Sequence, residues 1–249
     1  MVSAAAQRAA VAFWTPGRMA QAAAAGGPPA GTPTAATFAG IPTVGVLFYT
    51  TGTQKHFCTA SVTDSRPGDL VLTAAHCVYR KRYATNVAYV PRYHDGLRPF
   101  GTWPVKAMLV ATRWKKAHDP DDDFAFLALG TVGKQQVQSV TKGLALGLNG
   151  SYAEPVEVIG YNDSGDEPLR CHVRSFKFRA RQQEFYCHDF WIGTSGGPWI
   201  TGFNAATGTG TVHGVIGGYQ EGGRHEWASY SPYFGSQAAA LYRAAEKLG

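Results

Sequence analysis

Short segments that are apolar, or that alternate apolar and polar positions, recur along the chain from about residue 43 to residue 217. Gly, Pro, Asn and Asp residues stand between them, as they do at the turns between strands. This pattern predicts an all-β fold built from many short strands. The clearest candidates are Thr43–Tyr49, Val87–Val90, Val105–Val110, Val156–Tyr161, Phe176–Phe178, Gly197–Ile200 and Thr211–Gly217.

The two ends of the chain follow other patterns. Residues 236–249 predict a C-terminal helix over Ser236–Leu248, with Ser236 as its N-cap and Gly249 as its stop. Its apolar face would carry Leu241, Ala244, Ala245 and Leu248. Residues 1–40 are rich in Ala, Gly, Pro and Thr and include the low-complexity run Ala22–Pro33, so we expect a separate, flexible segment there.

Length and charge exclude several classes of protein. A chain of 249 residues can bury a substantial core, in one large β domain or two smaller ones. The net charge of +6 comes partly from basic residues between Arg170 and Arg181 that alternate with apolar ones. A solvated strand face explains this better than nucleic-acid binding. No run reaches the ~18 apolar residues of a membrane span, and no cofactor motif occurs, so we expect neither a membrane span nor a cofactor.

The segment Gly193-Thr194-Ser195-Gly196-Gly197-Pro198 carries the strongest chemical signal. Glycines on both sides of Ser195 allow a sharp turn with positive φ, so that the hydroxyl projects from the chain. Backbone N–H groups that converge beside such a hydroxyl can stabilise an oxyanion. An ordinary turn is the alternative interpretation of this segment alone.

Two further segments favour the catalytic interpretation. Thr73-Ala74-Ala75-His76-Cys77 follows an apolar strand, and Asp123 directly precedes the apolar run Phe124–Leu127. The T-A-A-H-C and G-T-S-G-G-P motifs, with an aspartate between them, resemble the trypsin/chymotrypsin-like serine peptidase family. The resemblance is to its secreted bacterial branch, which is related to glutamyl-endopeptidase-like enzymes. The order His, Asp, Ser is that of the chymotrypsin arrangement.

The chemistry of these residue types supports specific roles. A serine hydroxyl needs an adjacent base, and a neutral imidazole titrates near the working pH. We therefore predict Ser195 as nucleophile, His76 as general base and acid, and Asp123 as the carboxylate that orients the imidazole. Asp119, Asp121 and Asp122 are neighbouring alternatives, but only Asp123 directly precedes the strand. The resemblance implies an oxyanion hole made by the N–H groups of Gly193 and Ser195.

The resemblance also implies a domain organisation. We expect two six-stranded antiparallel β-barrels, at 41–130 and 131–235, with the site in the cleft between them and a C-terminal helix at 236–249 on the second barrel. Such a protein would be a monomeric serine endopeptidase that acts on protein or peptide substrates through an acyl-enzyme. A catalytically inactive binding or adhesion protein on the same fold is the alternative.

The four cysteines favour an oxidising compartment. In the family, a disulfide lies near the active-site histidine, which implies a Cys58–Cys77 bridge here, and Cys171 and Cys187 would form the second. Zinc binding is a weaker interpretation, because no C-x-x-C pair occurs, so we expect no metal site. We expect a secreted protein whose signal peptide is not present in this chain, because residues 1–12 lack an adequate apolar region.

The segment Phe13–Met19 resembles the prosegment motif of secreted bacterial relatives. We expect residues 1–40 to be a propeptide whose Phe13 and Trp14 dock on the folded domain; a disordered tail is the alternative. Thr194 stands where animal digestive members carry the aspartate that pairs with a newly cut N-terminus. We therefore expect that this zymogen is not activated through such an ion pair.

Substrate preference is the least determined feature. Asp189 stands six residues before Ser195, the offset at which trypsin carries its pocket carboxylate, so a preference for basic residues is one expectation. A broad or apolar preference is the other, because a shift of one residue would move Asp189 out of the pocket. We expect Gly217, Gly218 and Tyr219 to belong to the wall that binds the substrate backbone.

Overall fold

The computed structural model describes residues 2–15, 27–163 and 165–248, and it divides the chain into two compact units, Met1–Gly31 and Thr32–Gly249. The first unit contains helix α1 (Ala4–Phe13), whose N-cap residue Ser3 accepts a hydrogen bond from the N–H of Ala6. The rings of Phe13 and Trp14 pack edge to face at 5.4 Å. Docking of these rings stays a prediction, and residues 16–19 of the predicted prosegment motif lie outside the described residues.

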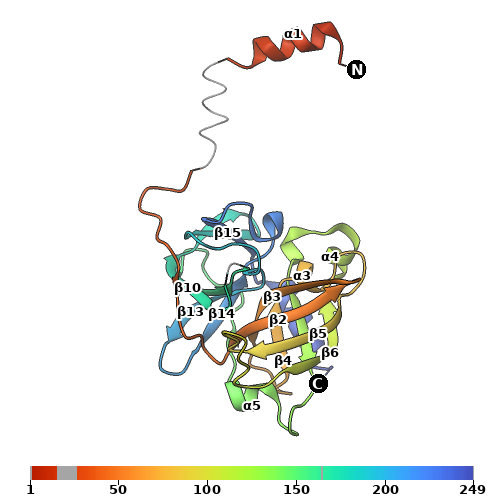
Figure 1. The fold of residues 1–249 in the computed structure, drawn as a ribbon, viewed down its shortest axis with the longest axis vertical. Coiled ribbons are helices and arrows are strands. Elements are labelled where there is room, and N and C mark those ends of the chain that lie inside the picture. The colour runs from red at the N-terminus through yellow and green to blue at the C-terminus, as the bar shows by residue number, and fades with distance from the viewer. Residues whose placement is uncertain (1, 16–26, 164, 249) are drawn as a thin grey trace. The chain divides into compact units, whose positions relative to one another are not determined.

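The second unit contains a closed six-stranded barrel (Figure 1). The order around the barrel is β2-β3-β4-β7-β6-β5, and every pair of neighbours is antiparallel. Strands β4 and β7 are buried along their whole length, which explains their continuous apolar runs. The strands are β2 (Val44–Thr51), β3 (Gln54–Val62), β4 (Leu70–Thr73), β5 (Thr85–Pro91), β6 (Trp103–Val110) and β7 (Ala125–Leu129).

Short helices occupy the connections between these strands and the link to the second half. They are α3 (Ala75–Val78), α4 (Thr112–Ala117), the 3-10 turn η1 (Pro120–Asp122) and α5 (Val137–Thr141). The α3 helix follows β4, and η1 precedes β7, so both short elements lie at the same end of two paired strands.

The second half consists of two sheets (Figure 1). The larger has the order β1-β10-β9-β13-β14-β8, in which only the β14–β8 pair is parallel, and the smaller has the order β11-β12-β15. The all-β prediction is therefore confirmed, although this half is described as two sheets rather than as one closed sheet. The strands are β1 (Ala36–Thr37), β8 (Ala145–Leu146), β9 (Pro155–Tyr161), β10 (Pro168–Arg174), β11 (Phe176–Arg179), β12 (Gln182–Tyr186), β13 (Pro198–Asn204), β14 (Thr209–Val215) and β15 (Ala228–Pro232), with the 3-10 turn η2 (Tyr219–Gly222) before β15.

The N-terminal boundary lies earlier than the sequence suggested. Strand β1 pairs with β10, and the N–H of His188 donates to the carbonyl of Pro33 at 2.8 Å. Residues from Thr32 onward thus belong to the β-rich unit, so the structure places the boundary near Gly31 rather than at residue 40.

The C-terminal helix α6 (Ser236–Ala245) is present, but it packs on a different surface from the one expected. It contacts β6 and β7 of the first barrel, where the ring of Tyr242 packs edge to face on Phe126 at 5.6 Å. The hydroxyl of Tyr242 also donates to the carbonyl of Asp64 at 2.7 Å. The helix therefore ties the end of the chain back to the first barrel.

One hydrophobic cluster extends across both halves. It joins Leu72 and Phe126 from the first barrel to Ile159, Ile200 and Val212 from the second half. Burying this apolar surface fixes the two halves against each other, so residues from both can form a single rigid site. Within the described residues, no helix is long and apolar enough to cross a membrane.

His213 makes the stability of this core depend on pH. It lies on the buried β14 strand, and burial lowers its pKa to about 4. In the unfolded chain His213 therefore takes up a proton near pH 6.5, whereas in the folded protein it stays neutral until about pH 4. As pH falls through this window, we expect unfolding to become easier by about 3 kcal/mol. Urea unfolding of wild type and His213→Gln at pH 7 and pH 4.5 tests this. The free energy of unfolding should fall less between pH 7 and pH 4.5 in the variant than in wild type, and an equal fall in both proteins would contradict the prediction.

Candidate active site

His76 lies in the short helix α3, directly after the buried strand β4. It is 7% exposed, and its backbone N–H donates to Asp123 Oδ1 at 2.8 Å. Its ring Nδ1 lies 2.9 Å from Asp123 Oδ2. The same carboxylate thus accepts a backbone N–H in the first turn of α3 and fixes the orientation of the imidazole.

Asp123 lies between η1 and β7 and is fully buried. Its Oδ2 also accepts the N–H of Gly218 from the second half at 2.8 Å. Gly217 allows this close approach, because a Cβ there would lie 2.9 Å from the Asp123 carbonyl and 3.2 Å from Oδ2. The carboxylate is therefore held by donors from both halves of the protein.

The surroundings of His76 favour a charged imidazole. Burial lowers the pKa of His76, whereas the negative charge of Asp123 and its hydrogen bond raise it. The pKa of His76 lies above its ordinary value of 6.5 as a result. Such an imidazole can take up a proton during a reaction and hold it beside the carboxylate.

Ser195 lies on the tight loop that precedes β13. Gly196 has a φ of +81°, and a Cβ at that position would lie 2.2 Å from both the Thr59 carbonyl and the Thr73 hydroxyl. Gly193 has a φ of +100°, and a Cβ there would lie 2.5 Å from the Phe57 ring. The glycines that frame the serine are thus required both by the backbone angles and by contact with the first barrel.

Ser195 and His76 line the same cavity of about 680 Å³. Among the hydrogen bonds of the described residues, none uses the N–H of Gly193 or of Ser195, and none joins the Ser195 hydroxyl to His76. Hydrogen bonds between a nucleophile and its base are often long before substrate binds. The loop thus shares a cavity with the imidazole, and the N–H groups of Gly193 and Ser195 have no partner among the described residues.

The predicted substrate-binding residues lie elsewhere. Asp189 is exposed with a φ of +75° and is not among the residues that line this cavity, contrary to expectation. Its N–H donates to Glu226 Oε2 at 2.7 Å, and its carbonyl accepts from Asn162 at 2.7 Å. These contacts fix the backbone of Asp189 at the edge of the loop, and a role for its carboxylate in substrate preference stays a prediction.

Gly217, Gly218 and Tyr219 do not line the cavity either. Gly217 and Gly218 turn toward Asp123, and the Tyr219 N–H donates to Gln182 Oε1 at 2.9 Å. Ile216 and the segment 220–226 form that part of the lining instead.

Three acidic residues face the cavity, and each is held differently. Glu226 accepts a hydrogen bond from His188 Nδ1 at 2.9 Å, whereas Glu221 forms two hydrogen bonds with the Arg80 guanidinium at 3.0 and 2.7 Å. The third, Asp163, is exposed. Trp191 and Ile192, 52% and 76% exposed, add an apolar rim.

Sequence patterns did not predict two residues that hold this site together. Thr59 binds the Ser195 loop through its backbone and its hydroxyl. Gln182 links the Tyr219 N–H to Asp121 Oδ1, which lies close to Asp123 in the chain. Both are buried polar residues in strands, and no local motif distinguishes them from structural residues.

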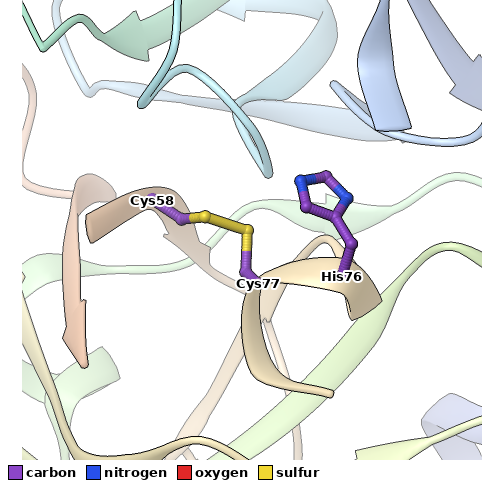
Figure 2. Close-up of side chains that lie close together, drawn as sticks. All are labelled: Cys58, His76 and Cys77. Carbon is purple, nitrogen blue, oxygen red and sulfur yellow. A yellow bond between two sulfur atoms is a disulfide. The ribbon is translucent and has the colours of Figure 1, made fainter. Parts of the chain in front are cut away.

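Cys58, His76 and Cys77 lie close enough together to resemble a metal site (Figure 2). The two sulfur atoms are bonded to each other, however, and Cys171 and Cys187 form the second disulfide. A disulfide offers no thiolate to a metal ion, so this group of residues does not fit zinc.

Comparisons with known proteins agree with this geometry. Protease Anisep from Arthrobacter nicotinovorans is 25% identical with a TM-score of 0.76, and the match covers 85% of this chain and 98% of that one. A thermostable serine protease, AL20, from an extremophilic microorganism is 26% identical with a TM-score of 0.76, over 84% and 98% of the two chains. A Glu endopeptidase, at 14% identity and a TM-score of 0.70 over 87% and 98%, shares the fold.

No curated protein matches the chain. The family model described as Trypsin, by contrast, matches residues 31–236, which is most of the chain and nearly all of the β-rich unit. The chain therefore belongs to the trypsin family.

Proposed function

We propose that the protein is a secreted serine endopeptidase that cleaves peptide bonds through Ser195, His76 and Asp123. Membership of the trypsin family makes the protein a serine-type endopeptidase. The assignment of these three residues is supported chiefly by one observation: the fully buried Asp123 orients His76, which shares a cavity with Ser195. Each of the three residues then has a separate chemical role.

The reaction would proceed in two steps. His76 Nε2 takes the proton of the Ser195 hydroxyl as Oγ attacks the substrate carbonyl carbon. The resulting tetrahedral species collapses when the imidazolium gives that proton to the leaving amine, which leaves an acyl-enzyme. Water then attacks the acyl carbon in the same manner and releases the acid and the free serine. Asp123 keeps the Nδ1 proton in place and stabilises the imidazolium in both steps.

The oxyanion of each tetrahedral species would bind to the N–H groups of Gly193 and Ser195. Both groups lie on the glycine-framed loop, and neither donates a hydrogen bond to another described residue. Donors that are fixed before the reaction need no reorganisation as charge develops.

Secretion and maturation belong to the same proposal. Two disulfides suit an oxidising compartment. If the N-terminal segment is a propeptide, its removal must spare residues from about Pro33 onward, because His188 and β10 bind that stretch. Thr194 has no carboxylate for an ion pair with a new N-terminus; its hydroxyl donates to the Trp191 carbonyl at 2.8 Å.

A binding protein on the same fold is the alternative, and a covalent probe distinguishes the two. Ser195→Ala should abolish labelling by a fluorophosphonate and lower kcat by about 10⁶-fold. Ser229→Ala is the matched control, because Ser229 lines the same cavity and should keep both properties. Labelling that survives in Ser195→Ala would refute the assigned nucleophile, and an unlabelled mature wild type would favour the binding protein.

The role of His76 predicts a pH profile. General-base catalysis needs the neutral imidazole, so kcat/KM should fall as the pH is lowered and His76 becomes protonated. Its midpoint should lie above pH 6.5, because the pKa of His76 is raised. His56→Gln, in another histidine of the cavity lining, should leave the midpoint unchanged. A wild-type midpoint below 6.5, or one that moves in His56→Gln, would contradict the assignment.

A further inference from the structure

We propose that Thr59, a residue of the first barrel, is a positioning residue that holds the Ser195 loop in the shape needed to bind an oxyanion. The catalytic part of this inference rests on the function proposed above. The structural part, that the Thr59 hydroxyl fixes the loop, stands on contacts of its own.

Thr59 makes four hydrogen bonds from a fully buried position on β3. Its N–H donates to the Ser195 carbonyl at 2.8 Å, and its hydroxyl donates to the Gly193 carbonyl at 3.1 Å. The hydroxyl also accepts the N–H of Tyr161 at 2.9 Å, and the Thr59 carbonyl accepts the hydroxyl of Thr73 at 2.8 Å. The side chain thus acts as donor and acceptor at once, as a hydroxyl can and an apolar side chain of the same shape cannot.

Along the backbone, the two carbonyls that Thr59 binds alternate with the two N–H groups of the proposed oxyanion hole. Along the chain, the Gly193 N–H, the Gly193 carbonyl, the Ser195 N–H and the Ser195 carbonyl belong to four successive peptide planes. Peptide groups are planar, so fixing the second and fourth planes restricts the first and third. Thr59 binds the second and fourth of these planes, through the carbonyls of Gly193 and Ser195.

The loop needs such a support because of its composition. Gly193 and Gly196 have positive φ, and glycine loses more conformational freedom on ordering than any other residue. Thr194 is uncharged, and its hydroxyl donates its hydrogen bond within the loop itself, to the Trp191 carbonyl. Among the described residues, the hydrogen bonds that tie Gly193 and Ser195 to the first barrel both come from Thr59.

Replacing the hydroxyl alone isolates this effect. Thr59→Val keeps the shape of the side chain but leaves the Gly193 carbonyl and the Tyr161 N–H without their partner. Thr59→Ser restores the hydroxyl. Thr63→Val is the matched control, because Thr63 is an equally buried threonine beside the same strand whose hydroxyl has no partner within the described part of the chain.

Hydrogen exchange of the full chain tests the structural part without any need for activity. Amides of residues 190–196 should exchange faster in Thr59→Val than in wild type, and at wild-type rates in Thr59→Ser and Thr63→Val. Equal exchange in Thr59→Val and Thr63→Val would overturn the proposal, whether or not the protein is a peptidase.

Kinetics on a peptide substrate tests the catalytic part. Thr59→Val should lower kcat by about 10²-fold with little change in KM, since a misplacement of about 1 Å costs this much. Thr59→Ser should recover most of kcat. A loss confined to KM, or an equal loss in Thr63→Val, would overturn the positioning role, whereas failure of Ser195 to react in wild type would count against the proposed function instead.

Discussion

The buried charge of Asp123 is the constraint on which the site depends. A carboxylate without access to water is costly unless its oxygens accept hydrogen bonds, and here the donors are the N–H and Nδ1 of His76 and the N–H of Gly218. Two donors come from the first barrel and one from the second half. Separating the halves would therefore leave a buried charge without full compensation, so the position of His76 depends on the contact between them.

The Ser195 loop likewise depends on contacts with the other half of the protein. It belongs to the second half, yet Gly196 packs directly on the Thr59 carbonyl, and two of the loop's carbonyls are bound by Thr59. Each half thus supplies polar groups that complete the site of the other. The hydrophobic cluster that spans both halves holds them at the distance these short contacts need.

Local patterns predicted the parts of this protein whose causes are local. Apolar and alternating segments predicted several of the strands between Val44 and Val215, although β3, β10 and β12 were not among the candidates. The glycines around Ser195 predicted a tight turn, which close backbone contacts do require. Features set by distant contacts were missed: the absence of Asp189 from the cavity lining, the surface under α6, and the hydrogen bond between Thr59 and Gly193, which are 134 positions apart in the sequence. The sequence around a polar strand residue such as Gln182 does not indicate which distant groups its side chain will bind in the fold.

Trapping the acyl-enzyme tests the central claim, that Ser195 is the nucleophile oriented through His76 and Asp123. An ester substrate is mixed with the protein, the reaction is quenched in acid within its first turnover, and the peptides are mapped by mass. The account predicts that the acyl group is found on Ser195 in wild type and that no acyl group accumulates in His76→Ala. An acyl group on another residue, or undiminished acylation of Ser195 in His76→Ala, would contradict it.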